Sequence, residues 1–451
     1  MTDWADREYT YTYDADGLTE QIAYPNGVTT GFDRDDNGQT LAVTTTGHGI
    51  DLLELAYGYT DAGLLADQGT TRSKQSRAPP TTPSTSSTYA WDDLARISQV
   101  TGDNAGTFDF DAAGSVTALA DGRALTYDAA RQLTALVTPT TTPDEAPITT
   151  GYTYDGRGNR ATATADTGPA AGTITHAYDQ ANRLTSVTGA DSSTTTYTYA
   201  ATGLRATATT GTTTERYTWD TLAGIPLLLT DHTHAYLYGN GSIPLAQVDL
   251  TDGTVDYLHA DTLGSVRSTT DATGAVTSDA DYDPYGRPEA PTFVPTAEVT
   301  RFGYAGEYAD PTGYLYLRAR YYDPESAQFL TRDPLEATTG NPYGYTDGNP
   351  LQFTDPLGLD WLDDTGNWVA GFGDTVTFGG TKEIRRLINY AMNGETDDCS
   401  VINECSTFYT WGSVGGVFGS VATVVATGGF GAALGVAATG KSGLDIVTNL
   451  Q

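Results

Sequence analysis

A short pattern, aromatic residues followed by aspartate, recurs along the first 290 residues and limits what this chain can fold into. The repeats are about twenty residues apart where no insertion intervenes. Self-similarity at such a period predicts a repeat architecture instead of independent domains. The units are YTYDADGLT at Tyr11, YGYTDAGLL at Tyr57, YAWDDLARI at Tyr89, FDFDAAGSV at Phe108, LTYDAARQL at Leu125, YTYDGRGNR at Tyr152, HAYDQANRL at His176 and YTYAATGLR at Tyr197.

Each unit reads as a β-hairpin. Alternation in Tyr-Thr-Tyr places the aromatic rings on one face of a strand, Asp-x-x-Gly supplies a turn, and the alternating residues that follow make the return strand. Because one hairpin is only marginally stable in water, we expect the units to pair edge to edge into one long continuous sheet. The predicted fold class is therefore mainly β.

Composition narrows the class of partner. The chain has 451 residues, more than one hydrophobic core usually fills, which agrees with a repeated architecture. Its formal net charge is -34, with 23 basic residues against 57 acidic ones. Such a surface repels nucleic acid and anionic membranes, so we expect no nucleic-acid partner for the main body. Adaptation to high salt would produce the same bias, and charge alone does not separate the two explanations.

The ends of the sequence carry weaker signals. No apolar segment follows a basic start at the N-terminus, so no signal peptide is visible, and the first repeat begins within a dozen residues. These features suggest a late piece of a longer product that is secreted or displayed on a cell surface by a specialised system. Cys399 and Cys405 could form one short-loop disulfide or remain two thiols.

Candidate chemistry gathers between Arg320 and Leu359, where aspartate precedes proline three times, at Asp323, Asp333 and Asp355. Carboxylates that converge repel, so one should hold its proton near neutrality while the other stays ionised, which is what acid and base cleavage of an amide needs. We select Asp333 and Asp355 as the pair, with Arg320 holding the ionised carboxylate. Taken singly, each Asp-Pro is better explained as a turn.

The spacing from Pro350 through Asp355-Pro356 to Gly358-Leu359 resembles the P-x-x-x-x-D-P-x-G-L motif that closes the core of RHS-repeat proteins, a family that includes polymorphic toxins. The aromatic-aspartate units resemble the YD repeats of that family. Passages between Tyr257 and Pro288 resemble the segments that lead into the core.

This resemblance implies a cocoon-like shell built as a spiral of hairpins, and a chain that cuts itself between Leu359 and Asp360 by an aspartyl-type mechanism. Arg320, Asp333 and Asp355 match the positions implicated in self-cleaving members. Pro350, Pro356 and Gly358 support the motif, and Asp323 is a secondary candidate. Any enzyme activity would be one intramolecular cut. The expected domains are a repeat shell over 1–256, an RHS core over 257–359 and a C-terminal segment over 360–451.

The C-terminal segment differs in composition from the rest. A helix is expected from Thr381 to Met392, with Ile384, Leu387 and Ile388 at helical spacing. Residues 406–440 carry no charge and are rich in Gly, Ala and Val, so they could cross a bilayer or pack as buried helices. This segment resembles the pre-toxin segments that follow RHS cores, with the usual catalytic payload missing or truncated.

Other chemistry is less well supported by the residues. His259, Asp261 and Ser265 crowd into seven positions beside a glycine, so turn formation explains them better than a nucleophile triad. The histidines, including His232 and His234, lack convincing metal-ligand spacing, and the Asp-x-x-Gly turns lack the dense ligands of a calcium loop. No metal or cofactor is expected.

The leading hypothesis is an RHS polymorphic toxin shell that encloses its own C-terminal region and releases it by self-cleavage. A delivery-system component and an immunity protein are the further partners that the resemblance implies. One alternative is a cell-surface module whose tyrosine-rich repeats bind carbohydrate or protein without cleavage. Another is that residues 406–440 form a pore-forming hairpin in a target membrane.

Overall fold

The fold was analysed in a computed structural model that describes residues 1–72, 85–140, 142, 145–222, 224–289 and 299–359. The chain divides into two compact units, of which the first consists of Met1–Thr221 and Pro226–Trp361. Only this first unit is described below. The helix expected from Thr381 to Met392, the apolar residues 406–440 and both cysteines lie outside the described residues.

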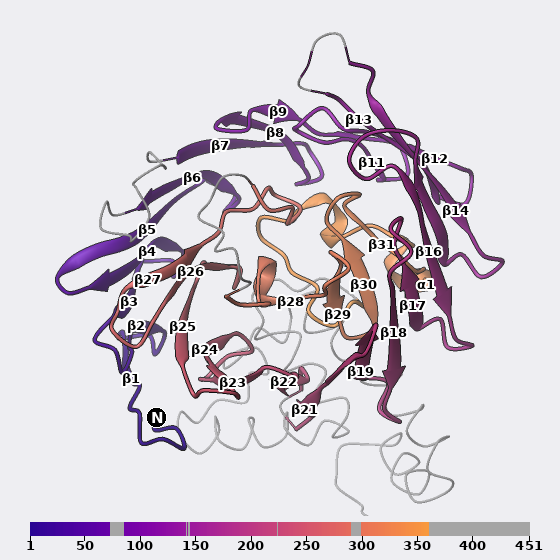
Figure 1. Ribbon diagram of the computed structural model, residues 1–451. Coiled ribbons are helices and arrows are strands. Elements are labelled where there is room, and N and C mark those ends of the chain that lie inside the picture. Colours follow the sequence, from indigo (N-terminus) through magenta and orange to yellow (C-terminus); the bar gives the residue numbers. More distant parts are fainter. Residues whose placement is uncertain (73–84, 141, 143–144, 223, 290–298, 360–451) are drawn as a thin grey trace, which may run out of the picture. The chain divides into compact units, whose positions relative to one another are not determined.

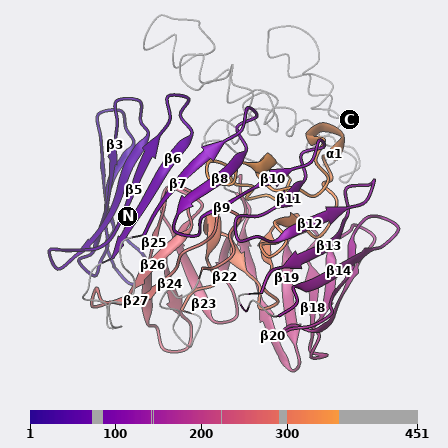
Figure 2. The same ribbon diagram turned by 90° about the horizontal axis from the view of Figure 1, so that it is seen from above.

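Three long antiparallel sheets and one short sheet follow one another along the chain, and within each sheet the strands pair in sequence order. The first sheet contains β1 (Thr10–Tyr13), β2 (Thr19–Ala23), β3 (Thr29–Arg34), β4 (Thr40–Gly47), β5 (Ile50–Tyr59), β6 (Leu65–Arg72), β7 (Thr85–Trp91), β8 (Ile97–Gly102) and β9 (Gly106–Thr107). Strands β3 to β8 run side by side in Figure 2.

The second sheet is the longest. It contains β10 (Asp109–Phe110), β11 (Val116–Ala118), β12 (Ala124–Tyr127), β13 (Leu133–Thr138), β14 (Ile148–Tyr154), β15 (Arg160–Ala165), β16 (Gly172–Tyr178), β17 (Leu184–Thr188), β18 (Thr194–Tyr199), β19 (Arg205–Thr210) and β20 (Thr213–Arg216).

The last two sheets complete the unit. The third contains β21 (Thr218–Asp220), β22 (Leu227–Thr230), β23 (His234–Tyr238), β24 (Pro244–Asp249), β25 (Val255–Ala260), β26 (Val266–Thr270) and β27 (Val276–Asp279). The fourth contains β28 (Tyr308–Ala309), β29 (Leu315–Leu317), β30 (Arg320–Asp323) and β31 (Gln328–Phe329). Short helical turns occur at η1 (Tyr304–Gly306), α1 (Glu336–Thr339) and η2 (Thr346–Gly348). None of the helices among the described residues has the length and apolar character needed to cross a bilayer.

The turns of the repeat have one recurring geometry, shown well by the hairpin of β14 and β15. The Asp155 carboxylate accepts hydrogen bonds from the backbone N–H groups of Arg157 and Asn159, at 2.8 and 3.0 Å. The N–H of Gly158 donates to the Asp155 carbonyl at 3.0 Å, and Gly158 has φ of +84°. Aspartate and glycine are needed because one caps its own turn and the other accepts left-handed backbone without steric cost.

The predicted fold class is confirmed for the described residues, which are almost entirely antiparallel β-structure. The hairpins form where the aromatic-aspartate units predicted them, but in two separate sheets and not in the one continuous sheet expected, because strand pairing stops at β9 and begins again at β10. The boundary expected after residue 256 falls inside β25, whose neighbours β24 and β26 belong to the same sheet, so the division into 1–256 and 257–359 stays a prediction about the sequence.

The short sheet packs against all three long ones. Figure 1 shows β28 to β31 in orange, with strands of the longer sheets around them. One buried cluster joins Ile97, Leu125 and Leu133 of the first two sheets with Leu315, Tyr322 and Phe329 of the short sheet, and a second joins Tyr197, Tyr236 and Leu258 with Tyr308, Tyr316 and Tyr321. The short sheet is thus the common core of the described unit.

Buried arginines of the long sheets pair with aspartates at the turns of the short sheet. Arg160 contacts the Asp323 carboxylate at 2.6 Å, and Arg205 contacts that of Asp310 at 2.5 Å. Both guanidinium groups are fully buried, so each needs a countercharge to offset the loss of water. These pairs fix the short sheet, and hence the candidate site on it, relative to the second sheet.

Candidate functional site

The P-x-x-x-x-D-P-x-G-L motif ends in a turn of the same kind as the repeat turns. The carboxylate of Asp355 accepts a hydrogen bond from the N–H of Leu359 at 2.9 Å, and the Gly358 N–H donates to the Asp355 carbonyl at 3.1 Å. Gly358 has φ of +65°, and a Cβ at this position would lie 2.7 Å from the carbonyl oxygen of Leu317. Only glycine fits both the backbone conformation and the close approach to β29.

The turn between β29 and β30 holds this motif by its backbone. An Nη1 of Arg318 donates to the Pro356 carbonyl at 2.8 Å, and the N–H of Ala319 donates to the Leu357 carbonyl at 3.1 Å. The Nε of Arg320 donates to the carbonyl of Gly358. The carbonyls of residues 356, 357 and 358 are therefore bound, in that order, by Arg318 and Ala319 of the hairpin turn and by Arg320, the first residue of β30.

Arg320 and Asp355, two of the three residues selected from the sequence, lie in contact. An Nη2 of Arg320 lies 3.2 Å from the Asp355 carboxylate, and each side chain is 3% exposed. The guanidinium carbon of Arg320 also lies 3.6 Å from the centroid of the Phe329 ring. A buried, arginine-paired carboxylate four residues from the expected cut is the arrangement that the chemistry requires of the ionised partner.

A second carboxyl group, Glu307, lies beside this pair and was missed by the sequence reasoning. Glu307 is buried and pairs with Arg318, whose Nη1 also binds Pro356. Burial raises the pKa of Glu307 to about 7; Arg318 opposes the rise, and the nearby charge of Asp355 adds to it. Glu307 carries no local sequence signal, because its partner Arg318 lies at the other end of the hairpin that β28 and β29 form.

Asp333 is buried but is engaged elsewhere. Its carboxylate accepts hydrogen bonds from the Leu335 N–H at 2.7 Å and the Thr339 hydroxyl at 2.8 Å, so it holds the loop that contains α1. Its own N–H donates to the Pro342 carbonyl at 2.8 Å. Within the described part of the chain, the Asp333 carboxylate forms no hydrogen bond or ion pair with Arg320 or Asp355.

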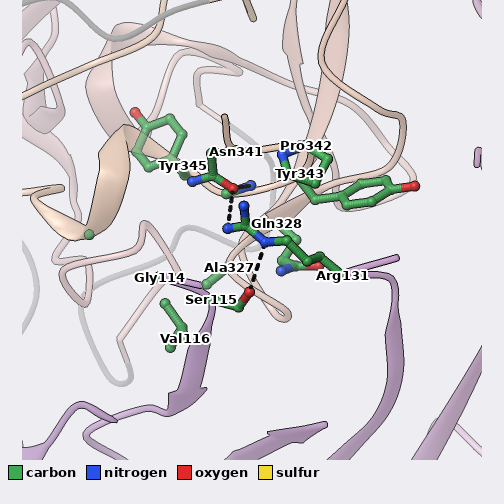
Figure 3. A pocket seen from close by; sticks show the side chains of 12 residues that line it. Gly114, Ser115, Val116, Arg131, Ala327, Gln328, Asn341, Pro342, Tyr343 and Tyr345 are labelled. Carbon is green, nitrogen blue, oxygen red and sulfur yellow. Dashed lines mark hydrogen bonds between the residues drawn. The ribbon is translucent and has the colours of Figure 1, made fainter. Parts of the chain in front are cut away.

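The loop after Asp333 is pinned to the second sheet and leads back to the site. Figure 3 shows Arg131, from the turn between β12 and β13, reaching Asn341 and Ser115, with Nη2 3.2 Å from the Asn341 oxygen. Farther along this loop, Tyr345 is buried with its ring 4.5 Å from that of Tyr322. Burial, followed by the charges of Asp355 and Glu307, raises the pKa of Tyr345, so this phenol faces both carboxyl groups in its neutral form.

The remaining predicted residues have structural partners. Asp323 pairs with Arg160 and accepts from the Ser326 hydroxyl at 2.6 Å, while the carbonyl of Pro350 accepts from the Tyr304 hydroxyl at 3.1 Å. Leu359 is the last described residue of the motif, and Asp360 lies outside the described residues. The bond expected to be cut therefore has only its N-terminal side described.

His259, Asp261 and Ser265 do not form a triad. The ring nitrogens of His259 contact the hydroxyls of Thr30 and Thr270, at 3.2 and 2.9 Å. The Asp261 carboxylate binds backbone N–H groups of its own turn, and the Ser265 hydroxyl accepts from the Ala305 N–H at 3.0 Å. Among the residues described here, no group of three or more histidine, cysteine or acidic side chains is placed to hold a metal ion.

Comparisons with known proteins were made by sequence and by structure. No family model matches the chain. The tRNA3(Ser)-specific nuclease WapA of Bacillus spizizenii is 28% identical over 233 residues, which is 50% of this chain and 9% of the relative. Double-stranded DNA deaminase toxin A of Burkholderia cenocepacia is 28% identical over 147 residues, 28% of this chain and 10% of that protein.

The crystal structure of TcdB2-TccC3-Cdc42 has the same fold over much of the described unit. Its TM-score is 0.56 at 20% identity, and the match covers 78% of this chain and 19% of that one. These findings support an RHS-type protein. This chain spans less than a tenth of the length of the WapA relative.

Proposed function

We propose that this chain is the shell and core region of an RHS polymorphic toxin, which encloses its own C-terminal segment and cuts the bond between Leu359 and Asp360. Similarity to proteins named as a nuclease WapA and a deaminase toxin supports a toxin context. Transport to or beyond the cell surface, a delivery-system component and an immunity protein belong to the same proposal.

One observation carries the cleavage proposal. Arg320 and Asp355 form a buried contact beside the turn that precedes Leu359. The carbonyls of residues 356, 357 and 358 in this turn all accept hydrogen bonds. An intramolecular protease needs a fixed carbonyl register and a paired carboxylate within reach of the next peptide bond. Holding these groups in place beforehand removes the entropic cost of bringing the reactants together.

The proposed step is hydrolysis by two carboxyl groups. Water adds to the carbonyl carbon of Leu359 and gives its proton to an ionised carboxylate, and a protonated carboxyl gives its proton to the Asp360 nitrogen as the C–N bond breaks. Asp355, held by Arg320, and Asp333 are the proposed pair. Because the Asp333 carboxylate is bonded to Leu335 and Thr339 here, its part in the reaction requires those hydrogen bonds to be exchanged.

Intact mass of the purified full chain tests this proposal. The wild type is expected to give two fragments that meet at Leu359 and Asp360, and both Asp333→Asn and Asp355→Asn are expected to give one uncut mass. Asp323→Asn is the matched control, since Asp323 is also buried, arginine-paired and followed by proline. It should lose stability yet still be cut.

One uncut mass for wild type and all variants would refute the protease and leave a shell or a binding module. Loss of cleavage in the Asp323 control as well would show that any damage to the core stops the reaction.

A further inference from the structure

The grip on residues 356–358 depends on an arginine in an unfavourable backbone conformation. Leu317 pairs with Arg320 across β29 and β30, so Arg318 and Ala319 form a two-residue hairpin turn. Arg318 has φ of +61°, in the left-handed region that glycine adopts without cost and other residues avoid. A non-glycine residue costs stability in this conformation, and the contacts of the Arg318 side chain offset that cost.

The guanidinium of Arg318 joins three separate parts of the chain. Its Nη1 contacts both the Glu307 carboxylate and the Pro356 carbonyl, and its Nε donates to the Pro226 carbonyl at 3.2 Å. Among the described residues, Glu307 is the carboxylate that pairs with the Arg318 guanidinium and keeps it at the Pro356 carbonyl. Glu307 therefore sets where Arg318 points.

Among the described residues, four titratable or charged groups interact with Glu307. They are Arg318 from the hairpin turn, Asp355 from the motif, Tyr345 from the loop after Asp333, and Tyr238 from β23, whose pKa is also influenced by Glu307 and Arg318. Only Arg318 carries positive charge among these four, and it sits between Glu307 and the backbone of the motif. The pair is thus built into the proposed cleavage site and is not an isolated surface contact.

Resting on the proposed self-cleavage, we propose that Glu307 and Arg318 are positioning residues that set the register of the cut. Arg318 anchors the Pro356 carbonyl, the Ala319 N–H anchors Leu357, and Arg320 anchors Gly358, so that the next carbonyl, that of Leu359, falls at Asp355. Glu307 acts through Arg318 and does not need to touch the reacting atoms.

Synthesis of the full chain in a cell-free system, with the cut fraction followed over time, tests this role. Arg318→Gly removes the guanidinium and relieves the backbone strain, but it leaves the buried Glu307 carboxyl without its countercharge, so a loss of stability is expected on any account. The positioning role expects, in addition, cleavage at least tenfold slower. Glu307→Gln should also slow cleavage, because its amide cannot hold Arg318 by charge. Arg318→Lys, which keeps a cationic donor, should recover part of the rate.

Ala95→Gly is the backbone control. Ala95 also has positive φ, at +59°, and is half-buried in a repeat turn, so the change relaxes the same kind of strain away from the site. Its cleavage rate should equal that of the wild type. Unfolding midpoints, measured for each variant in an Asp355→Asn background, separate slow chemistry from a weakened fold.

The outcomes distinguish this inference from the proposed function. If the wild type is never cut, both fail together. If the wild type is cut and Asp355→Asn is not, yet Arg318→Gly and Glu307→Gln cut at the wild-type rate, only the positioning role is overturned. It is equally overturned if Arg318→Gly is slow and Arg318→Lys recovers nothing, or if the unfolding midpoints fall in step with the rates.

Discussion

In several repeats the aromatic residue just before the turn links its hairpin to the preceding one. The hydroxyl of Tyr178 donates to the carbonyl of Arg160 at 2.9 Å, and that of Tyr199 to Leu184 at 2.6 Å. In each case the acceptor is the first residue of an earlier return strand. Trp91 replaces tyrosine because its indole N–H makes the equivalent bond, to Leu65 at 2.8 Å.

Phe110 lacks such a donor, and its ring instead lies 4.3 Å from the guanidinium carbon of Arg96. The tolerated substitutions in the repeat thus follow from which side chains can bond or stack at this position. The repeat is a packing rule as much as a turn signal.

Gly358→Ala should weaken the motif turn more than an ordinary glycine replacement does. The new methyl would meet the Leu317 carbonyl at 2.7 Å and would force a positive φ on alanine. We expect a loss of about 1–3 kcal/mol in the free energy of unfolding, measured by urea denaturation. Gly313→Ala is the control, because Gly313 also has positive φ, at +89°, but nothing lies within 4 Å of its added Cβ. Equal losses for the two variants would contradict the steric explanation.

At the scale of elements, buried ion pairs that no local sequence pattern predicts hold the short sheet in place. Arg160 starts β15 and Asp323 ends β30, and they are 163 residues apart in the chain. The aspartate of each repeat turn is readable from sequence, because its hydrogen bonds are local. Its distant arginine is not, and the same limit hid Glu307 beside Arg318.

The same distinction between local and long-range contacts applies to the candidate site. The sequence predicted hairpins at the repeat units and selected Arg320 to hold the ionised one of two carboxylates, Asp333 or Asp355. It did not indicate that Arg320 would lie beside Asp355. Nor did it indicate that Asp333 would bond to Leu335 and Thr339, because those contacts depend on how the loop from Asp333 to Asn341 closes on itself.

A double-mutant cycle measures the Arg160–Asp323 pair. Arg160→Met should cost about 3–5 kcal/mol in urea denaturation, because it leaves the Asp323 carboxylate buried without its countercharge. Asp323→Leu in the same chain should recover a large part of that loss, since neither charge then remains buried. Simple additivity of the two single losses would show that the ion pair does not couple the second sheet to the short one.

At the scale of the whole described unit, a buried histidine is one of the contacts between the first and third sheets. His259 in β25 lies between Thr30 of β3 and Thr270 of β26. Burial lowers the pKa of His259 to about 3 from its ordinary value of 6.5. The folded chain therefore binds this proton less readily than the unfolded chain does, so the contribution of His259 is fully present above pH 6.5 and is lost as pH falls toward 3.

His259→Gln should reduce the pH dependence of stability below pH 6.5. One proton taken up on unfolding corresponds to a slope of about 1.4 kcal/mol per pH unit. Urea denaturation at several pH values between 4 and 7 should show a shallower slope in the variant by roughly this amount. His48→Gln is the control, because His48 makes an exposed contact with the Thr273 carbonyl. An unchanged slope in His259→Gln would assign the acid sensitivity to other groups.

The grip of Arg318, Ala319 and Arg320 on residues 356–358 lies wholly on one side of the proposed cut. Breaking the bond after Leu359 would cost none of those hydrogen bonds, so the new chain end would stay where it was made. Each chain would therefore make one cut and keep its own product in the site, so that no second substrate would bind.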